Sequence, residues 1–197
     1  MFFALPVISL AAIIMLLSFE DINDNADKKY LAELMEEYKV FALPIPQKLY
    51  FAGERVPLND SEVRERFDRE LHVNTYWHSQ TILFLKRANR WFPIIEPILK
   101  EHGVPEDFKY LALIESGLMN VVSPAGAAGF WQILETTGRE LGLEIRAEVD
   151  ERYHVEKSTI AACKFLLESY KLYNNWAMAA ADRKSVVLGK SVDMGGG

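Results

Sequence analysis

The stretch FKYLALIESGL, residues 108–118, places a carboxylate where a core residue would be expected. Phe108, Leu111 and Ala112 share one face at helical spacing, and the next residue on that face is Glu115. The partial negative charge of a helix C-terminus and an apolar surround both disfavour a charged carboxyl group. They favour the protonated form that a general acid needs near neutral pH. The structural alternative is a glutamate satisfied by a buried arginine or by backbone donors.

The segment from Ser123 to Ile133, SPAGAAGFWQI, combines a nearly bare backbone with aromatic and amide side chains. Small residues let a ligand or another chain segment approach the backbone closely. Phe130 and Trp131 offer aromatic faces, and Gln132 offers two donors and an acceptor. This combination suits a sugar better than a phosphate, because the Gly-Lys-Ser/Thr ending of a phosphate-binding loop is missing. The alternative is a tight interhelical turn with buried aromatic side chains.

Other catalytic constellations find little support in the sequence. The four histidines are scattered, with no HExxH motif and no Cys/His pairing, so no zinc site is expected. No serine is flanked as in the nucleophile motif G-x-S-x-G. The single cysteine, Cys163, cannot form an intramolecular disulfide and is expected to be a small buried hydrophobic residue. The charged segment 150–159 is expected to supply helix capping and solvated surface.

The composition predicts a folded protein of one domain with an appendage, or of two small domains. The chain has 197 residues, of which 50% are hydrophobic and 12% aromatic, enough for a packed core. Its net charge of −6 argues against a general nucleic-acid binder, which would carry a basic surface.

The N-terminus predicts export. Residues 2–19 contain no charged side chain, and Glu20, Asp21, Asp24 and Asp27 follow directly. Such an apolar run is typical of a secretory signal peptide or a short membrane anchor, and a buried core helix is the alternative. No basic residue precedes the run and no A-x-A site follows it, so cleavage stays open. We expect a location in the periplasm or cell envelope, with membrane association through this segment if it is retained.

The pattern beyond this segment is helical nearly throughout, and the expected fold is all-α or nearly so. Asn59 and Glu62 are spaced as a capping box for a helix whose inner face is Val63, Phe67, Leu71 and Asn74. The Pro-rich stretch 41–58 is expected to be an extended connector. Further helices are expected over 26–40, up to Pro93, from 94 to a C-terminal cap at Gly103, from Pro105 to the glycine after Ser116, over 130–141 and over 157–173.

Taken in order, four segments resemble the lytic transglycosylases of the lysozyme-like (goose-type) superfamily, and most closely the membrane-bound lytic transglycosylase D type. The segments are IESGL, SPAGAAGFWQI, TTGRELGL and VDERYHVEKSTIAACKFLLESY. The resemblance covers about Val56 to Ala181. It implies an α-helical catalytic domain that cleaves the MurNAc-β-1,4-GlcNAc bond of peptidoglycan, with no cofactor.

The resemblance also implies roles for individual residues. Glu115 matches the single catalytic acid of the family. Ser123 and Gln132 match positions that contact the glycan and its N-acetyl groups, and Gly129 matches the glycine that gives the glycan access to the backbone. Phe130 and Trp131 replace residues that vary among hydrophobic types.

The implied reaction uses one carboxyl group where ordinary glycosidases use two. The acid protonates the leaving oxygen and then takes the proton of the MurNAc C6 hydroxyl as that oxygen closes on C1, giving a 1,6-anhydro sugar. A hydrolytic muramidase on the same fold and a catalytically inactive peptidoglycan-binding module are the alternatives.

The chain departs from the family pattern after NWAMAAA. The family continues with Tyr-Asn-x-Gly, whereas this chain reads DRKSVVLGKSVDMGGG, which resembles translated sequencing-adapter read-through. The catalytic domain is therefore expected to be truncated at its C-terminus. The expected organisation is a signal peptide or anchor at 1–19, an N-terminal helix and connector at 20–58, an incomplete catalytic domain at 59–181 and an unrelated tail at 182–197.

Overall fold

The computed structural model describes residues 29, 32–33 and 41–187. The chain divides into two compact units, Met1–Leu43 and Pro44–Gly197, and the elements below belong to the second. The predicted leader or anchor lies outside the described residues, as does most of the helix predicted over 26–40. Within the described part of the chain, none of the helices combines the length and the apolar character needed to cross a bilayer.

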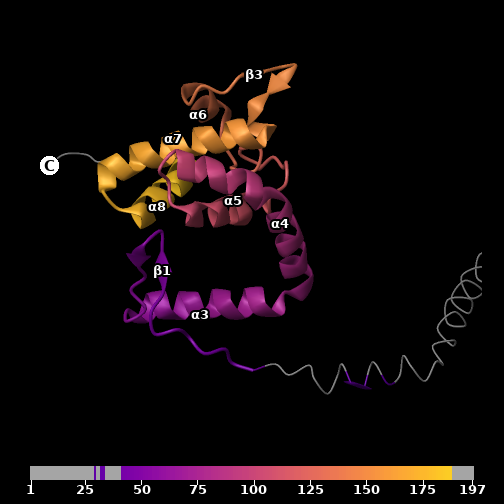
Figure 1. Cartoon of the computed structure of the whole chain (residues 1–197), viewed down its shortest axis with the longest axis vertical. Helices are drawn as coiled ribbons and strands as arrows, with labels where there is room; N and C mark the ends of the chain where they lie inside the picture. The colour runs from indigo at the N-terminus through magenta and orange to yellow at the C-terminus, as the bar shows by residue number, and fades with distance from the viewer. Residues whose placement is uncertain (1–28, 30–31, 34–40, 188–197) are drawn as a thin grey trace, which may run out of the picture. The chain divides into compact units, whose positions relative to one another are not determined.

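The second unit is mostly helical, which confirms the predicted fold class (Figure 1). Two short antiparallel hairpins, β1–β2 and β3–β4, interrupt the helices. In chain order the elements are β1 (Tyr50–Phe51), β2 (Glu54–Arg55), α3 (Ser61–Tyr76), α4 (His78–Glu101), the 3-10 turn η1 (Glu106–Phe108), α5 (Lys109–Ser116), α6 (Glu135–Glu140), β3 (Ile145–Arg146), β4 (Val149–Asp150), the 3-10 turn η2 (Glu151–Tyr153), α7 (Val155–Tyr173) and α8 (Trp176–Val187).

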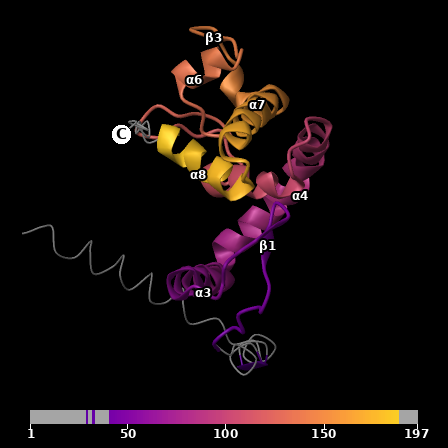
Figure 2. The same cartoon turned by 90° about the vertical axis from the view of Figure 1, so that its left-hand side faces the viewer.

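The hydrophobic core forms where α7 packs against α4 and α8, and α5 packs against α4. Leu99 of α4, Phe108 of η1 and Leu166 of α7 are fully buried in it. Cys163 is buried there too, which confirms its predicted role, and burial raises the pKa of its thiol to about 12. Figure 2 shows α8 beside α7. These contacts place α5, which carries Glu115, against α4.

The start of α3 differs from the prediction by one residue. Asp60, not Asn59, is the N-cap, and its side chain accepts the backbone N–H groups of Glu62 and Val63. No residue of this helix is buried, and Asn74 of the predicted inner face is exposed. The helix is therefore held by its cap and its junction with α4 more than by burial of a hydrophobic face.

One long helix, α4, replaces the two that the prolines suggested. Pro93 and Pro97 lie inside it, so the carbonyl groups one turn before them receive no intrahelical N–H. The helix ends before Gly103, whose φ of +71° fits the predicted glycine cap. The next helical segment starts later than predicted, because Pro105 is extended and caps the 3-10 turn η1.

The Pro-rich connector contains the first hairpin, which the sequence analysis missed. The backbone N–H of Ala52 at its turn donates to Asp107 Oδ2 at 2.7 Å. The carboxylate of Glu54 accepts the N–H groups of Trp176 at 2.6 Å and Ala177 at 3.0 Å. The hairpin is therefore attached to η1 and to the first turn of α8.

The helix predicted over 130–141 is wrong in its first half. Only Glu135–Glu140 is helical, because Gln132 has a left-handed backbone with φ of +46° that a helix cannot contain. The helix predicted over 157–173 is confirmed within α7. At the other end, α8 continues beyond the predicted boundary at Ala181, and Asp182 accepts hydrogen bonds from Ser169 and Tyr173. The boundary itself stays a prediction.

Candidate active site

Glu115 lies on the last turn of α5 and is half-buried. The helix ends as predicted, with Gly117 in the left-handed region at φ of +63°. Glu115 lines a concavity of about 420 Å³ between α5 and α8, together with apolar side chains. The other lining residues are Leu111, Ile114, Ala180 and Ala181.

The carboxylate of Glu115 has neither a hydrogen bond nor an ion pair with any residue in the range 41–182, over which the structure describes side chains. The structural alternative of a glutamate satisfied by a buried arginine therefore finds no support in this part of the chain. The carboxyl group therefore lines the concavity without being committed to another residue of this part of the chain.

Ser116 connects the end of α5 to the loop that follows, a role that the sequence analysis missed. This side chain is buried, and its Oγ donates to the Phe130 carbonyl at 2.9 Å, with the Ala112 carbonyl at 3.2 Å. On the other side, Arg87 of α4 donates to the Gly117 carbonyl at 3.1 Å. Glu115 is thus carried on a helix end that both α4 and the loop hold in place.

The loop from Ser123 to Ile133 is folded into a compact, hydrogen-bonded unit. Isolated β-bridges pair Val122 with Ala128, and Ala128 with Ile133. Ser123 closes the first turn, because its Oγ accepts the Ala127 N–H at 3.1 Å. Within residues 41–182, the hydroxyl proton of Ser123 has no acceptor, which leaves a donor at the rim of the loop.

Gly129 is needed where two parts of the chain meet. A Cβ at this position would lie 2.0 Å from the Arg152 carbonyl oxygen, and the φ of +76° also favours glycine. The close approach that its bare backbone allows is therefore made by another segment of the chain. Access of a glycan to this backbone stays a prediction.

Phe130 and Trp131 lie in the core. They are 3% and 0% exposed. Phe130 packs edge-to-face on Trp91, and Trp131 Nε1 donates to Thr159 Oγ1 at 2.8 Å. This is the arrangement that the alternative of a tight turn with buried aromatics requires. Contact of these two rings with a sugar stays a prediction. Their burial in the core does not support it.

Gln132 is 5% exposed and braces the loop from inside. Its Nε2 donates to the carbonyl groups of Gly129 at 2.8 Å and Val121 at 3.0 Å. Both amide hydrogens are therefore used, and no partner for Oε1 is recorded in the described part of the chain. The free acceptor is the part of this side chain that a ligand N–H could use.

Arg152 was assigned to solvated surface by the sequence analysis, which is wrong. It is 8% exposed and hydrogen-bonded to Asp150 and to the loop carbonyls of Gly126 and Ile133. Asp150 raises the pKa of Arg152, and the guanidinium in turn lowers the pKa of Asp150 below its usual value. Helical or strand periodicity does not indicate this role of Arg152, because the carbonyl groups that it binds belong to a loop distant in sequence.

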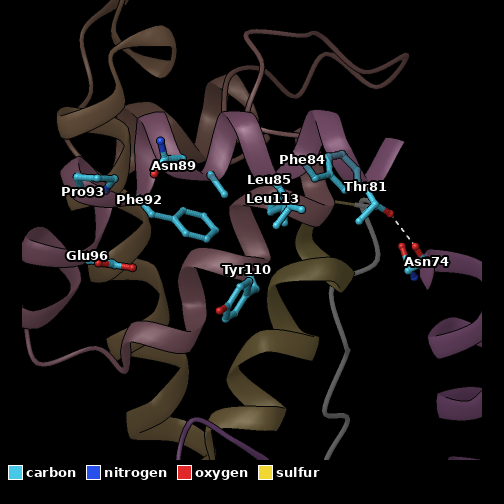
Figure 3. A pocket seen from close by; sticks show the side chains of 11 residues that line it. Asn74, Thr81, Phe84, Leu85, Asn89, Phe92, Pro93, Glu96, Tyr110 and Leu113 are labelled. Carbon is cyan, nitrogen blue, oxygen red and sulfur yellow. Dashed lines mark hydrogen bonds between the residues drawn. The ribbon is translucent and has the colours of Figure 1, made fainter. Parts of the chain in front are cut away.

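A second concavity, of about 610 Å³, is lined by α4, α5 and Asn74 near the end of α3, and contains none of the predicted site residues (Figure 3). Its polar groups are largely engaged: Glu96 pairs with Lys109 at 2.6 Å, a hydrogen bond that raises the pKa of Lys109, and Thr81 donates to the Asn74 carbonyl. The remaining lining residues are Phe84, Leu85, Ala88, Asn89, Phe92, Pro93, Tyr110 and Leu113.

The chemistry of the candidate site centres on one carboxyl group. Among the described residues, no three His, Cys, Asp or Glu side chains gather as they would to hold a metal ion. Glu115 and the loop from Ser123 to Ile133 are joined through Ser116, so the structure brings the predicted acid and the predicted glycan-contacting loop together.

Comparison with known proteins confirms the predicted resemblance to the lytic transglycosylases. Residues 92–182 match the family model described as the transglycosylase SLT domain. The chain is also 31% identical over 128 residues to the membrane-bound lytic murein transglycosylase D of Escherichia coli K12, and equally to that of Escherichia coli O6:H1. These alignments cover 64% of this chain and 27% of each relative, so the chain spans about a quarter of the length of the relatives it matches.

Proposed function

We propose that the chain carries the catalytic domain of a peptidoglycan lytic transglycosylase, which cleaves the MurNAc-β-1,4-GlcNAc bond and leaves 1,6-anhydro-MurNAc ends. The observation that carries the proposal is the position of Glu115 inside the matched segment, where it lines a concavity and has no side-chain partner among residues 41–182. The names of the two relatives, which describe murein transglycosylases, support the same substrate.

In the proposed reaction, Glu115 acts first as an acid and then as a base. Its carboxyl group protonates the glycosidic oxygen, and the bond from that oxygen to MurNAc C1 breaks. The substrate's N-acetyl group or enzyme dipoles stabilise the positive charge at C1. The C6 hydroxyl oxygen then bonds to C1, and its proton returns to Glu115. The carboxyl group ends as it began and no water is consumed, so a second carboxylate is not required.

The polar groups of the loop are proposed to hold the glycan. The Ser123 hydroxyl supplies a donor at the rim, and Gln132 Oε1 supplies an acceptor for an N-acetyl N–H. We propose that Gly129, Phe130 and Trp131 act mainly by fixing the loop, since their recorded contacts are with the rest of the chain. This division gives each predicted site residue a role that suits its burial.

We propose that the protein works in the cell envelope, where peptidoglycan is found. Residues 1–19 would serve as its export signal or membrane anchor, in line with the apolar sequence there. The relatives' description as membrane-bound supports this location. Residues 59–181 are proposed as the catalytic domain, with 182–197 as a separate tail.

The test is digestion of purified sacculi with the full chain, followed by mass spectrometry of the released muropeptides. Anhydro ends, lighter than reducing ends by one water, are expected. Replacing Glu115→Gln removes the acid without changing the size of the side chain, and should lower cleavage at least ~100-fold while the melting temperature is kept. Glu140→Gln, an exposed carboxylate on α6, is the matched control and should cleave normally.

The other outcomes of the same experiment identify the alternatives. Reducing ends would indicate a hydrolytic muramidase on this fold. Binding to sacculi without cleavage would indicate a binding module. A Glu115→Gln variant with full activity would refute the assignment of the acid.

A further inference from the structure

We infer that Arg152, held by Asp150, is a positioning residue that sets the conformation of the loop from Ser123 to Ile133 for glycan binding. The inference rests on the proposed function for the identity of the ligand. The fixing of the loop is a property of the chain alone and can be measured without any substrate.

The carboxylate of Asp150 orients the guanidinium group of Arg152. Arg152 Nε lies 2.9 Å and 3.1 Å from the two Asp150 oxygens, and Nη2 donates to Oδ2 at 2.6 Å. Asp150 also accepts the backbone N–H of Arg152 at 3.1 Å. A bidentate pair of this kind fixes the plane of the guanidinium, so the direction of its remaining N–H groups is fixed as well.

The remaining nitrogen, Nη1, is directed at the loop. It donates to the Gly126 carbonyl at 3.0 Å and to the Ile133 carbonyl at 3.2 Å. Gly126 belongs to the turn that Ser123 closes, and Ile133 is the last residue of the segment. One nitrogen atom therefore bridges the first turn of the loop and its end.

The backbone of Arg152 contacts the middle of the same loop. Its carbonyl oxygen occupies the space where a side chain on Gly129 would begin. The residue thus meets the loop at three points, two through its side chain and one through its main chain. A residue that only filled the core would not need donors directed at two separate carbonyl groups.

Burial determines how Arg152 can act. The residue is 8% exposed, so it does not offer its charge to a ligand and must act through the loop that it holds. A buried guanidinium is stable only with its counter-charge and hydrogen bonds in place, which makes the arrangement all-or-none. Lysine could keep the charge, but its single ammonium group cannot reproduce the planar pairing with Asp150 and the bridge between two carbonyls.

The experiment compares the full chain with Arg152→Lys and Asp150→Asn, and with Arg146→Lys as the matched control. Arg146 lies on β3, in the same hairpin as Asp150, and pairs with Glu144 at the surface. For each protein we would measure the melting temperature, hydrogen exchange of the loop amides, and cleavage rate as a function of sacculus concentration. Asp150→Asn keeps the guanidinium, so it remains informative if Arg152→Lys folds poorly.

We expect Arg152→Lys to speed exchange at the amides of Gly126, Ala127 and Gly129 by about tenfold or more, while exchange in α7 is kept. The concentration of sacculi needed for half-maximal cleavage should rise about tenfold, and the rate at saturation should change less than about twofold, because binding groups are displaced and Glu115 is not. Asp150→Asn should shift both measurements in the same direction by less. Arg146→Lys should match the unmodified chain.

Two results would overturn the inference. The first is an Arg152→Lys protein whose loop exchange and dependence on sacculus concentration equal those of the unmodified chain. The second is a loss of cleavage that follows only the fraction of unfolded protein. If the unmodified chain fails to cleave sacculi, the proposed function fails, and loop exchange together with sacculus pull-down decides whether Arg152 positions this loop.

Discussion

The loop from Ser123 to Ile133 and the turn of α5 that carries Glu115 adjoin each other, yet they are held in different ways. The loop is fixed from inside, by two bridges, by the Gln132 amide and by Arg152. The Glu115 turn faces its concavity through apolar side chains, and Ile114 beside it is 73% exposed. The loop is closed by its own hydrogen bonds, whereas the turn of α5 is anchored through Ser116 and Gly117 and leaves the Glu115 carboxylate lining the concavity.

This difference fits the proposed roles of the two regions, in which the loop binds the glycan and Glu115 transfers protons. A surface that must present donors and acceptors to a sugar gains from being fixed in advance, because less freedom is lost on binding. A carboxyl group that gives up a proton and takes one back within one reaction gains from having no permanent ion-pair partner, which would favour one protonation state. Substitutions in the two regions should therefore differ in what they damage.

The largest effect is expected for Gly129→Ala. The new methyl group would meet the Arg152 carbonyl, and alanine is strained at a φ of +76°. The free energy of unfolding, measured by urea denaturation, should fall by about 3 kcal/mol or more. Gly126→Ala is the matched control: its φ is +81°, but no atom lies within 4 Å, so only the backbone strain of about 1 kcal/mol should appear. Equal losses in the two variants would show that the contact with Arg152 does not matter.

A smaller effect is expected for Thr159→Val. Valine has nearly the same shape but removes the Thr159 Oγ1 that accepts the hydrogen bond of the buried Trp131 Nε1–H, which should lower the free energy of unfolding by about 1–3 kcal/mol.

The counterpart beside Glu115 is Ile114→Ala, which should change the free energy of unfolding by less than about 0.5 kcal/mol because the side chain is mostly exposed. A larger loss for Ile114→Ala than for Thr159→Val would reverse the comparison between the two regions.

Among the interactions that hold the loop, the smallest effect is expected from acid, which acts on the pair of Asp150 and Arg152. Arg152 lowers the pKa of Asp150 in the folded protein, so this carboxylate stabilises the fold above its unfolded pKa of about 3.9. That contribution is lost as the pH falls through the lower folded value. Because Asp150 is partly exposed, we expect a loss of about 1 kcal/mol. Urea denaturation at about pH 6 and about pH 3 measures it. The Asp150→Asn variant should lack this part of the acid sensitivity, and an unchanged difference between the two pH values would contradict the role of the pair.

Local sequence signals predicted the helical part of the fold. Helical spacing correctly placed α7 and the buried face of Leu111 and Ala112, and the glycines correctly marked the ends of α4 and α5. These features depend on residues within one or two helical turns along the chain, so the spacing of apolar residues in the sequence indicates them directly. Glu115 was predicted as the acid because its position breaks that periodicity, and this role stays a prediction.

Features that depend on distant partners could not be predicted in the same way. Arg152 is surrounded by charged residues in sequence, and only the fold brings the loop carbonyls to its guanidinium. Gln132 adopts a left-handed backbone because its amide braces the loop, which overrides the helical pattern around it. The hairpin before α3 is likewise stabilised by Asp107 and α8, not by its own short strands.

The carboxylate of Glu54 also has a consequence for the order in which the chain folds. It caps α8 across a separation of 122 residues, so this contact cannot form until the ribosome has released almost the whole of the matched segment. Contacts between distant residues form late because a long loop must close first. We therefore expect the hairpin to engage α8 only after α3 to α7 have been synthesised.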